Sequence, residues 1–88
     1  LMKIGGITGW LRAMGQAEAA ALPVSSHLFI EASAHVLPVT PLAHYLEYLD
    51  IAGAVLTDPP PLVDGRVTAR GAGLGIEWDE AAVTRYRL

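Results

Sequence analysis

The stretch LPVSSHLFIEASAHVLPVTPLAHYLEYL, residues 22–49, carries the pattern that decides the fold. Residues 22–26 are a short β-forming run entered through a proline, which is tolerated at the first residue of a strand. Residues 28–37 then repeat apolar side chains at helical spacing, and the prolines that follow end the repeat. Residues 43–49 are a second apolar run, typical of a strand. Strand, helix and strand in this order predict a βαβ unit with a parallel sheet.

The residues before this stretch extend the same alternation. Residues 1–4 are a short apolar piece that predicts a first strand, and the Gly5-Gly6 pair marks its end. Apolar residues then recur at helical spacing over residues 7–21, with Thr8 as the expected N-cap. Residues 1–50 are therefore expected to run strand, helix, strand, helix, strand.

The residue composition changes over residues 51–88, which are rich in proline and glycine. A proline-rich link leads to an Asp64-Gly65 pair between β-forming residues, which predicts a hairpin. The glycine-rich residues 71–75 lack the strand-before, helix-after context of a phosphate-binding loop. A last helix is expected over residues 80–86. We interpret residues 51–88 as a tail with a hairpin and a short helix.

Composition excludes several classes of protein. The chain has 88 residues, of which 52% are hydrophobic and 17% are charged, with a net charge of −3 and no cysteine. This apolar content excludes intrinsic disorder, the charge argues against nucleic-acid binding, and the lack of cysteine excludes disulfides and thiolate metal sites. No uncharged stretch is long enough to span a bilayer. We expect a soluble, cytoplasmic protein, and the high apolar content indicates that part of it packs against further residues. Leu1 stands where a chain normally has Met, so we expect the sequence to start within a longer chain.

Five polar side chains in apolar settings are the candidate functional residues. His27, Glu31 and His35 would stack as a metal site on one continuous helix, but His27 follows a strand, so separate roles are expected. His27 ends a predicted parallel strand, where barrel enzymes carry catalytic groups; a capping or core histidine is the equal alternative. Glu47 in an apolar run is costly unless paired or protonated, and a buried ion pair or surface position is the alternative. His35 and His44 are expected to be packing or surface residues.

Four pieces of the chain, at matching order and spacing, together resemble the C-terminal part of the enolase superfamily. They are KIGGITGW at 3–10, SSHLF at 25–29, EASAH at 31–35 and AHYLE at 43–47. The mandelate racemase and muconate lactonizing enzyme branch is the most similar. GLGI at 73–76, followed by Trp78, is similar to the tail of that family.

The resemblance implies an α/β fold, the C-terminal segment of a modified (β/α) TIM-type barrel, with a tail that returns to a capping domain. Members abstract a proton next to a carboxylate and stabilise the enediolate with Mg²⁺. By resemblance His27 is the general base at the end of the seventh strand. Glu47 is the acid at the end of the eighth strand, and it hydrogen-bonds the substrate carboxylate. The lysine base and the metal carboxylates of the family have no match here, so no metal ligand is expected in this chain.

The expected function is that of part of a longer parent enzyme, a Mg²⁺-dependent racemase or dehydratase of a 2-hydroxy or sugar acid. The chain by itself is expected to be inactive. The expected partners are a small carboxylic acid, the rest of the barrel with its capping domain, and further copies in a homo-oligomer, but neither nucleic acid nor membrane. The alternative is a non-catalytic remnant that folds by self-association.

Overall fold

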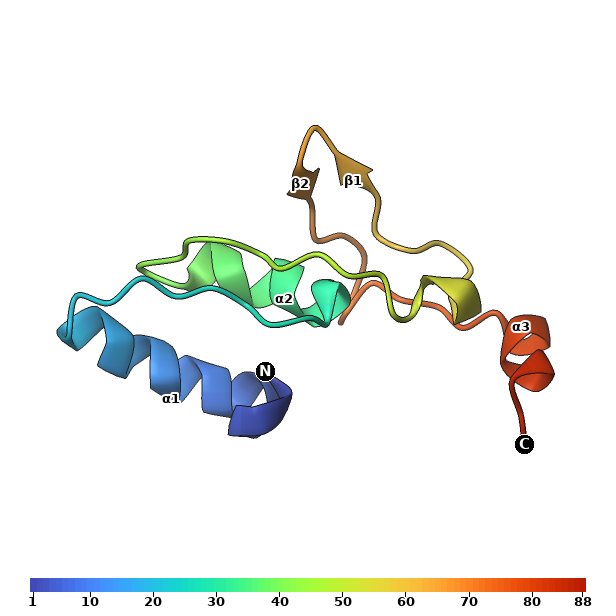
Figure 1. The fold of residues 1–88 in the computed structure, drawn as a ribbon, viewed down its shortest axis with the longest axis horizontal. Helices are drawn as coiled ribbons and strands as arrows, with labels where there is room; N and C mark the ends of the chain where they lie inside the picture. The colour runs from blue at the N-terminus through green and yellow to red at the C-terminus, as the bar shows by residue number, and fades with distance from the viewer.

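The computed structural model describes residues 1–88 as a small, open α/β arrangement (Figure 1). Its elements follow one another as the 3₁₀ turn η1, helices α1 and α2, the 3₁₀ turns η2 and η3, a two-stranded hairpin β1–β2, and helix α3. Their bounds are Met2–Ile4 (η1), Gly6–Ala19 (α1), Ile30–Val36 (α2), Leu37–Val39 (η2), Gly53–Val55 (η3), Leu62–Val63 (β1), Arg66–Val67 (β2) and Glu80–Arg85 (α3).

The first predicted helix is present, but its start differs from the prediction. Helix α1 begins at Gly6 with Gly5 as its N-cap, so Thr8 lies inside the helix and the expected Thr8 cap is wrong. Gly5 has φ 83°, a left-handed conformation that glycine adopts without steric cost, and this lets the chain turn directly into the helix. At Gly9 a Cβ atom would collide with the carbonyl oxygen of Ile4, so the close contact between η1 and α1 requires glycine there.

The strand predicted for residues 1–4 is not formed. Met2–Ile4 is a 3₁₀ turn, in which Ile4 N donates to Leu1 O at 3.3 Å and Gly6 N donates to Leu1 O at 3.0 Å. A strand needs a neighbouring strand to satisfy its backbone groups. No other segment pairs with residues 1–4 through backbone hydrogen bonds, so these residues bond to one another instead.

The central stretch forms a βαβ-like unit of minimal extent. Residues Val24 and Ala43 pair in parallel: Val24 N donates to Leu42 O at 2.8 Å, and His44 N donates to Val24 O at 2.8 Å. Figure 1 shows the two segments running in the same direction while α2 returns between them. The parallel pairing is therefore confirmed. The full strands predicted over residues 22–26 and 43–49 are wrong, because the two segments share a single bridge and one further backbone hydrogen bond, from Ser26 N to Tyr45 O.

The second helix is shorter than the repeat over residues 28–37 predicts. Helix α2 starts only at Ile30, because Leu28 and Phe29 have φ values of 55° and 50°, outside the helical region. The α-helix ends at Val36 although Leu37 keeps helical dihedral angles (φ −61°, ψ −40°), because Pro38 has no backbone N–H with which to continue the helical hydrogen bonds. The proline itself lies in the short turn η2.

The small core joins α1 to α2. Ile30, Ala34 and Val36 of α2 are buried, and Trp10 is the buried side chain of α1. The Trp10 indole Nε1 donates to Thr40 Oγ1 at 2.9 Å, and that hydroxyl in turn donates to the Val36 carbonyl at 2.8 Å. This buried chain of hydrogen bonds fixes α1 against the end of α2, as satisfied polar networks do in protein cores.

The hairpin is confirmed at the predicted place. Leu62 pairs with Val67, and Val63 pairs with Arg66, in antiparallel register. Asp64 and Gly65 form the turn with φ values of 48° and 71°. Two successive positive φ values define the type I′ turn that Asp-Gly favours, because its twist matches that of the strands. Figure 1 shows the hairpin projecting away from the helices.

The final helix is also present, with a well-formed start. Asp79 is the N-cap of α3, and its Oδ1 accepts a hydrogen bond from Ala82 N at 2.9 Å. Before it, Leu56 and Trp78 form an antiparallel bridge that joins the two ends of the tail. The predicted helix is therefore confirmed, ending at Arg85 rather than at Tyr86.

The chain as a whole is extended and open. Its radius of gyration is 14.3 Å, whereas a compact domain of this length has about 12 Å. Many large apolar side chains are exposed, among them Met2, Leu22, Tyr45 and Leu49. No helix has both the length and the apolar character that crossing a bilayer requires.

Candidate functional site

The parallel pairing brings the two candidate residues together from opposite ends of the βαβ unit. His27 follows the first paired segment and Glu47 follows the second, 20 positions later in the chain. A further hydrogen bond, from Ser26 N to Tyr45 O at 3.0 Å, keeps the segments adjacent up to this point. Because the segments run in the same direction, both side chains emerge at the same end of the pair, the end at which barrel enzymes carry their catalytic groups.

The imidazole and the carboxylate face each other without a direct hydrogen bond. His27 Nε2 lies 3.9 Å from Glu47 Oε2, and the two side chains are 68% and 52% exposed. Of the environments that the sequence left open for Glu47, the surface position is the one found in this chain. Residues 46–49 make no backbone hydrogen bond to a neighbouring segment, so the Glu47 carboxylate stays about half exposed.

Glu47 also holds the backbone next to His27. Its Oε2 accepts a hydrogen bond from Leu28 N at 3.2 Å. Leu28 and Phe29 both adopt left-handed backbone conformations, which cost about 1–3 kcal/mol each for residues with a side chain. Strain of this kind persists only where the surrounding contacts determine the conformation, and it gathers at functional sites.

A largely apolar groove of about 460 Å³ lies beside His27. It is lined by Leu1, Met2, Lys3, Ile4, Trp10, Ser25, His27, Leu28 and Phe29. Such a groove, with few polar groups, is the usual setting for a small ligand. Lys3 lines the same groove as His27, which the sequence did not indicate, because nothing in the local pattern shows that η1 folds back toward residue 27.

The other three candidate residues take separate places. Helix α2 begins at Ile30, so His27 does not stack with Glu31 and His35. Glu31 is buried, and its Oε1 has no hydrogen-bond partner within the chain; the same holds for His35 Nε2. His44 is exposed and lies against Tyr45, with ring centroids 3.8 Å apart. No three histidine, aspartate or glutamate side chains come together as metal ligands, so the residues of this chain do not fit a Mg²⁺ site.

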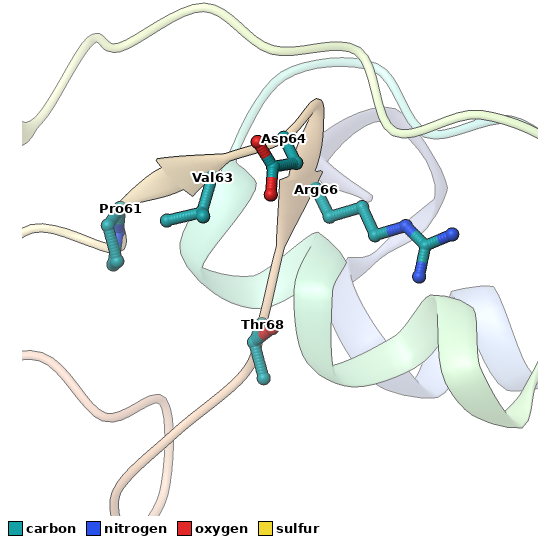
Figure 2. Close-up of a pocket in the computed structure, with 5 residues that line it drawn as sticks. All are labelled: Pro61, Val63, Asp64, Arg66 and Thr68. Carbon is teal, nitrogen blue, oxygen red and sulfur yellow. The ribbon is translucent and has the colours of Figure 1, made fainter.

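A second hollow, at the hairpin, is unrelated to these groups. It has a volume of about 410 Å³ and is lined by Pro61, Val63, Asp64, Arg66 and Thr68. Figure 2 shows that the Asp64 carboxylate and the Arg66 guanidinium do not converge: the guanidinium extends away from the hairpin. Without converging polar groups the hollow offers no chemistry, so His27 and Glu47 remain the candidate site.

The comparisons with known proteins agree with the fold. Residues 1–82 match the family described as enolase C-terminal domain-like, and the chain belongs to that family. The resemblance to the C-terminal part of the enolase superfamily is thereby confirmed.

Two solved structures are similar over nearly the whole chain. A crystal structure of an enolase from Bradyrhizobium, complexed with magnesium and mandelic acid, is 63% identical with a TM-score of 0.93. A crystal structure of an enolase from an alpha proteobacterium, BAL199, with bound magnesium, is 45% identical with a TM-score of 0.92. Each match covers 96% of this chain and 23% of the other. The chain therefore spans less than a quarter of the length of these relatives.

Proposed function

We propose that residues 1–88 form the closing part of a (β/α) barrel in a parent enzyme that abstracts the proton α to a carboxylate. The substrate class is a 2-hydroxy or sugar acid, and the outcome is racemisation or dehydration. The observation that carries the proposal is the approach of His27 Nε2 to within 3.9 Å of Glu47 Oε2 at the same end of two parallel segments. The Bradyrhizobium relative supports the substrate class, because mandelic acid is a 2-hydroxy acid.

Each side chain has a role that suits its chemistry. Neutral His27 accepts the α-proton, and the electrons of the broken C–H bond move into the carboxylate to give an enediolate. Glu47 is placed to hydrogen-bond a substrate carboxylate oxygen whose negative charge increases during this step. Delivery of a proton to the opposite face by a group elsewhere in the parent enzyme gives the other enantiomer, whereas transfer of the proton from His27 to a departing β-hydroxyl releases water and gives dehydration.

The metal belongs to the part of the parent outside these residues. Mg²⁺, when bound, stabilises negative charge on the substrate oxygens. Both solved relatives contain magnesium, but this chain gathers no three ligand side chains of its own. We therefore propose that Mg²⁺ is held by other strands of the barrel, and that residues 1–88 supply the base and the hydrogen-bonding acid.

The division of the chain follows from the same proposal. Residues 1–50 would contribute the last barrel segments, and residues 51–88 would return to a capping domain. The extended shape of the chain and its exposed apolar side chains support this division. In a complete barrel the neighbouring strands would pair with the extended segments, and other parts of the barrel would cover their apolar side chains. Association of parent enzymes into a homo-oligomer is part of the proposal.

A second candidate, a non-catalytic remnant that associates with its own copies, draws on the same exposed apolar surface. Unpaired strand edges can hydrogen-bond to another copy of the chain, and uncovered apolar faces can pack against one, so both favour self-association. The two candidates differ in what His27 is for: a remnant has no use for a base beside a carboxylate. Substitution of His27 therefore separates them.

The test is made in the complete parent enzyme with mandelate as the first probe and Mg²⁺ in the buffer. His27→Asn keeps the polar shape but removes the base, and we expect turnover to fall by about 10²- to 10⁴-fold. Glu47→Gln should lower kcat more than it raises KM, since its contact strengthens in the transition state. His44→Asn is the matched control, an exposed histidine away from the groove. Full turnover by His27→Asn in both stereochemical directions would contradict the proposal.

A further inference from the structure

The turn between His27 and helix α2 is held in a conformation that its own residues disfavour. Leu28 and Phe29, both bulky, have φ values of 55° and 50°. Single left-handed residues are usually Gly, Asn or Asp, and two large apolar residues in succession are an exception. Contacts with residues outside Leu28 and Phe29 must therefore determine this backbone conformation. The conformation then sets the direction of the chain that carries His27.

One residue of α2 binds the carbonyl groups of both left-handed residues. Ser33 Oγ donates to the Leu28 carbonyl at 2.8 Å, and Ser33 N donates to the Phe29 carbonyl at 2.8 Å. Ser33 is fully buried, with 0% of its surface exposed, so water does not compete for these bonds. Its position in the first turn of α2 makes the helix a fixed support for the turn.

The same turn is tied to the other candidate residue. The Leu28 peptide nitrogen donates to Glu47 Oε2 at 3.2 Å, while the Leu28 carbonyl accepts from Ser33 Oγ. Leu28 is therefore held on one side by the carboxylate of the site and on the other side by the buried serine. If the Leu28 carbonyl loses its donor, the Leu28–Phe29 peptide is free to rotate, and the adjoining His27–Leu28 peptide, which donates to Glu47, moves with it.

We propose that Ser33 is a positioning residue of the site: its buried hydroxyl fixes the Leu28–Phe29 turn and thereby sets the approach of His27 to Glu47. The inference rests on the proposed function, because positioning has a consequence only if His27 and Glu47 act on one substrate. Ser33 does not touch the reacting atoms, so its effect should be on the rate of the chemical step rather than on substrate binding.

The experiment measures kcat and KM of the complete parent enzyme with mandelate and Mg²⁺. Ser33→Ala and Ser33→Cys both remove a strong hydroxyl donor, and cysteine nearly keeps the volume. We expect kcat to fall about 10- to 100-fold with KM changed less than threefold. Ser33→Thr keeps a hydroxyl at this position, so its kcat should stay much closer to that of the unchanged enzyme. Thr40→Val is the matched control, since Thr40 is a second buried hydroxyl that donates to a carbonyl of α2 but has no contact with the turn.

A double-mutant cycle sharpens the test. Ser33→Ala and Glu47→Gln act on the two peptide groups on either side of the Leu28 Cα atom, so their effects on kcat should be clearly non-additive. A normal kcat in Ser33→Ala and Ser33→Cys would overturn the proposal. So would a loss in Thr40→Val equal to that in Ser33→Ala, because the effect would then follow stability alone. If His27→Asn keeps full turnover, the proposed function is wrong and the role of Ser33 is wrong with it. If His27→Asn loses turnover but the Ser33 variants do not, only the role of Ser33 is wrong.

Discussion

The isolated 88-residue chain is expected not to exist as a stable monomer in solution. Its accessible surface is 6181 Å², whereas a compact domain of its mass exposes about 5,000 Å². The difference, about 1,200 Å², is surface that a compact fold would have buried. With roughly 57% of it apolar and about 25 cal/mol per Å², the missing hydrophobic stabilisation is about 17 kcal/mol. This is at least as large as the total stability of a typical domain, about 5–15 kcal/mol.

The assay is size-exclusion chromatography with light scattering, followed by thermal unfolding monitored by circular dichroism. We expect oligomers or aggregates rather than a species of 9.3 kDa. A triple variant, Leu22→Lys, Tyr45→Lys and Leu49→Lys, removes exposed apolar surface from the two extended segments and should reduce association. Leu88→Lys is the control, because that residue lies at the exposed C-terminus. A monodisperse monomer of 9.3 kDa with one sharp, cooperative melt would refute the reasoning and favour an independent fold.

Two predictions concern stability within the complete parent enzyme. Trp10→Phe removes the buried hydrogen bond to Thr40 and should lower the free energy of unfolding by about 1–2 kcal/mol, measured by urea titration; Trp78→Phe, at an exposed indole, should change it by less than about 0.5 kcal/mol, and equal effects would contradict the assignment. Asp79→Ala removes the N-cap of α3 and should destabilise that helix by about 1 kcal/mol, seen as faster amide exchange at Ala82, whereas unchanged exchange there would show that the cap contributes nothing.

The sequence correctly predicted the elements whose geometry depends on residues close together in the chain. The hairpin was predictable because Asp64-Gly65 tolerates two positive φ values, and helix α3 because Asp79 caps the residues directly after it. Helix α1 was predictable from its apolar spacing, although its N-cap was not. There the deciding contact is the close approach of Ile4 to Gly9, which a pattern of helix formers does not reveal.

The paired segments were only partly predictable. The order of strand, helix and strand indicated parallel pairing, and Val24 does pair in parallel with Ala43. The extent of pairing was overestimated, because a β-forming run becomes a strand only where another segment supplies hydrogen-bond partners. For the same reason residues 1–4, equally apolar, form the 3₁₀ turn η1.

By itself the sequence determined the family, the two candidate residues, the hairpin and the presence of the three helices, because motif identity, turn chemistry and helical spacing depend on residues that lie close together in the sequence. Only the tertiary structure decided that His27 and Glu47 lie 3.9 Å apart, that Lys3 shares the groove beside His27, and that Ser33 holds the Leu28–Phe29 turn. Each of these relations joins residues from different elements or depends on a backbone conformation that the residue types disfavour. Local propensity cannot predict such relations, because the contacts that stabilise them form only when the chain folds.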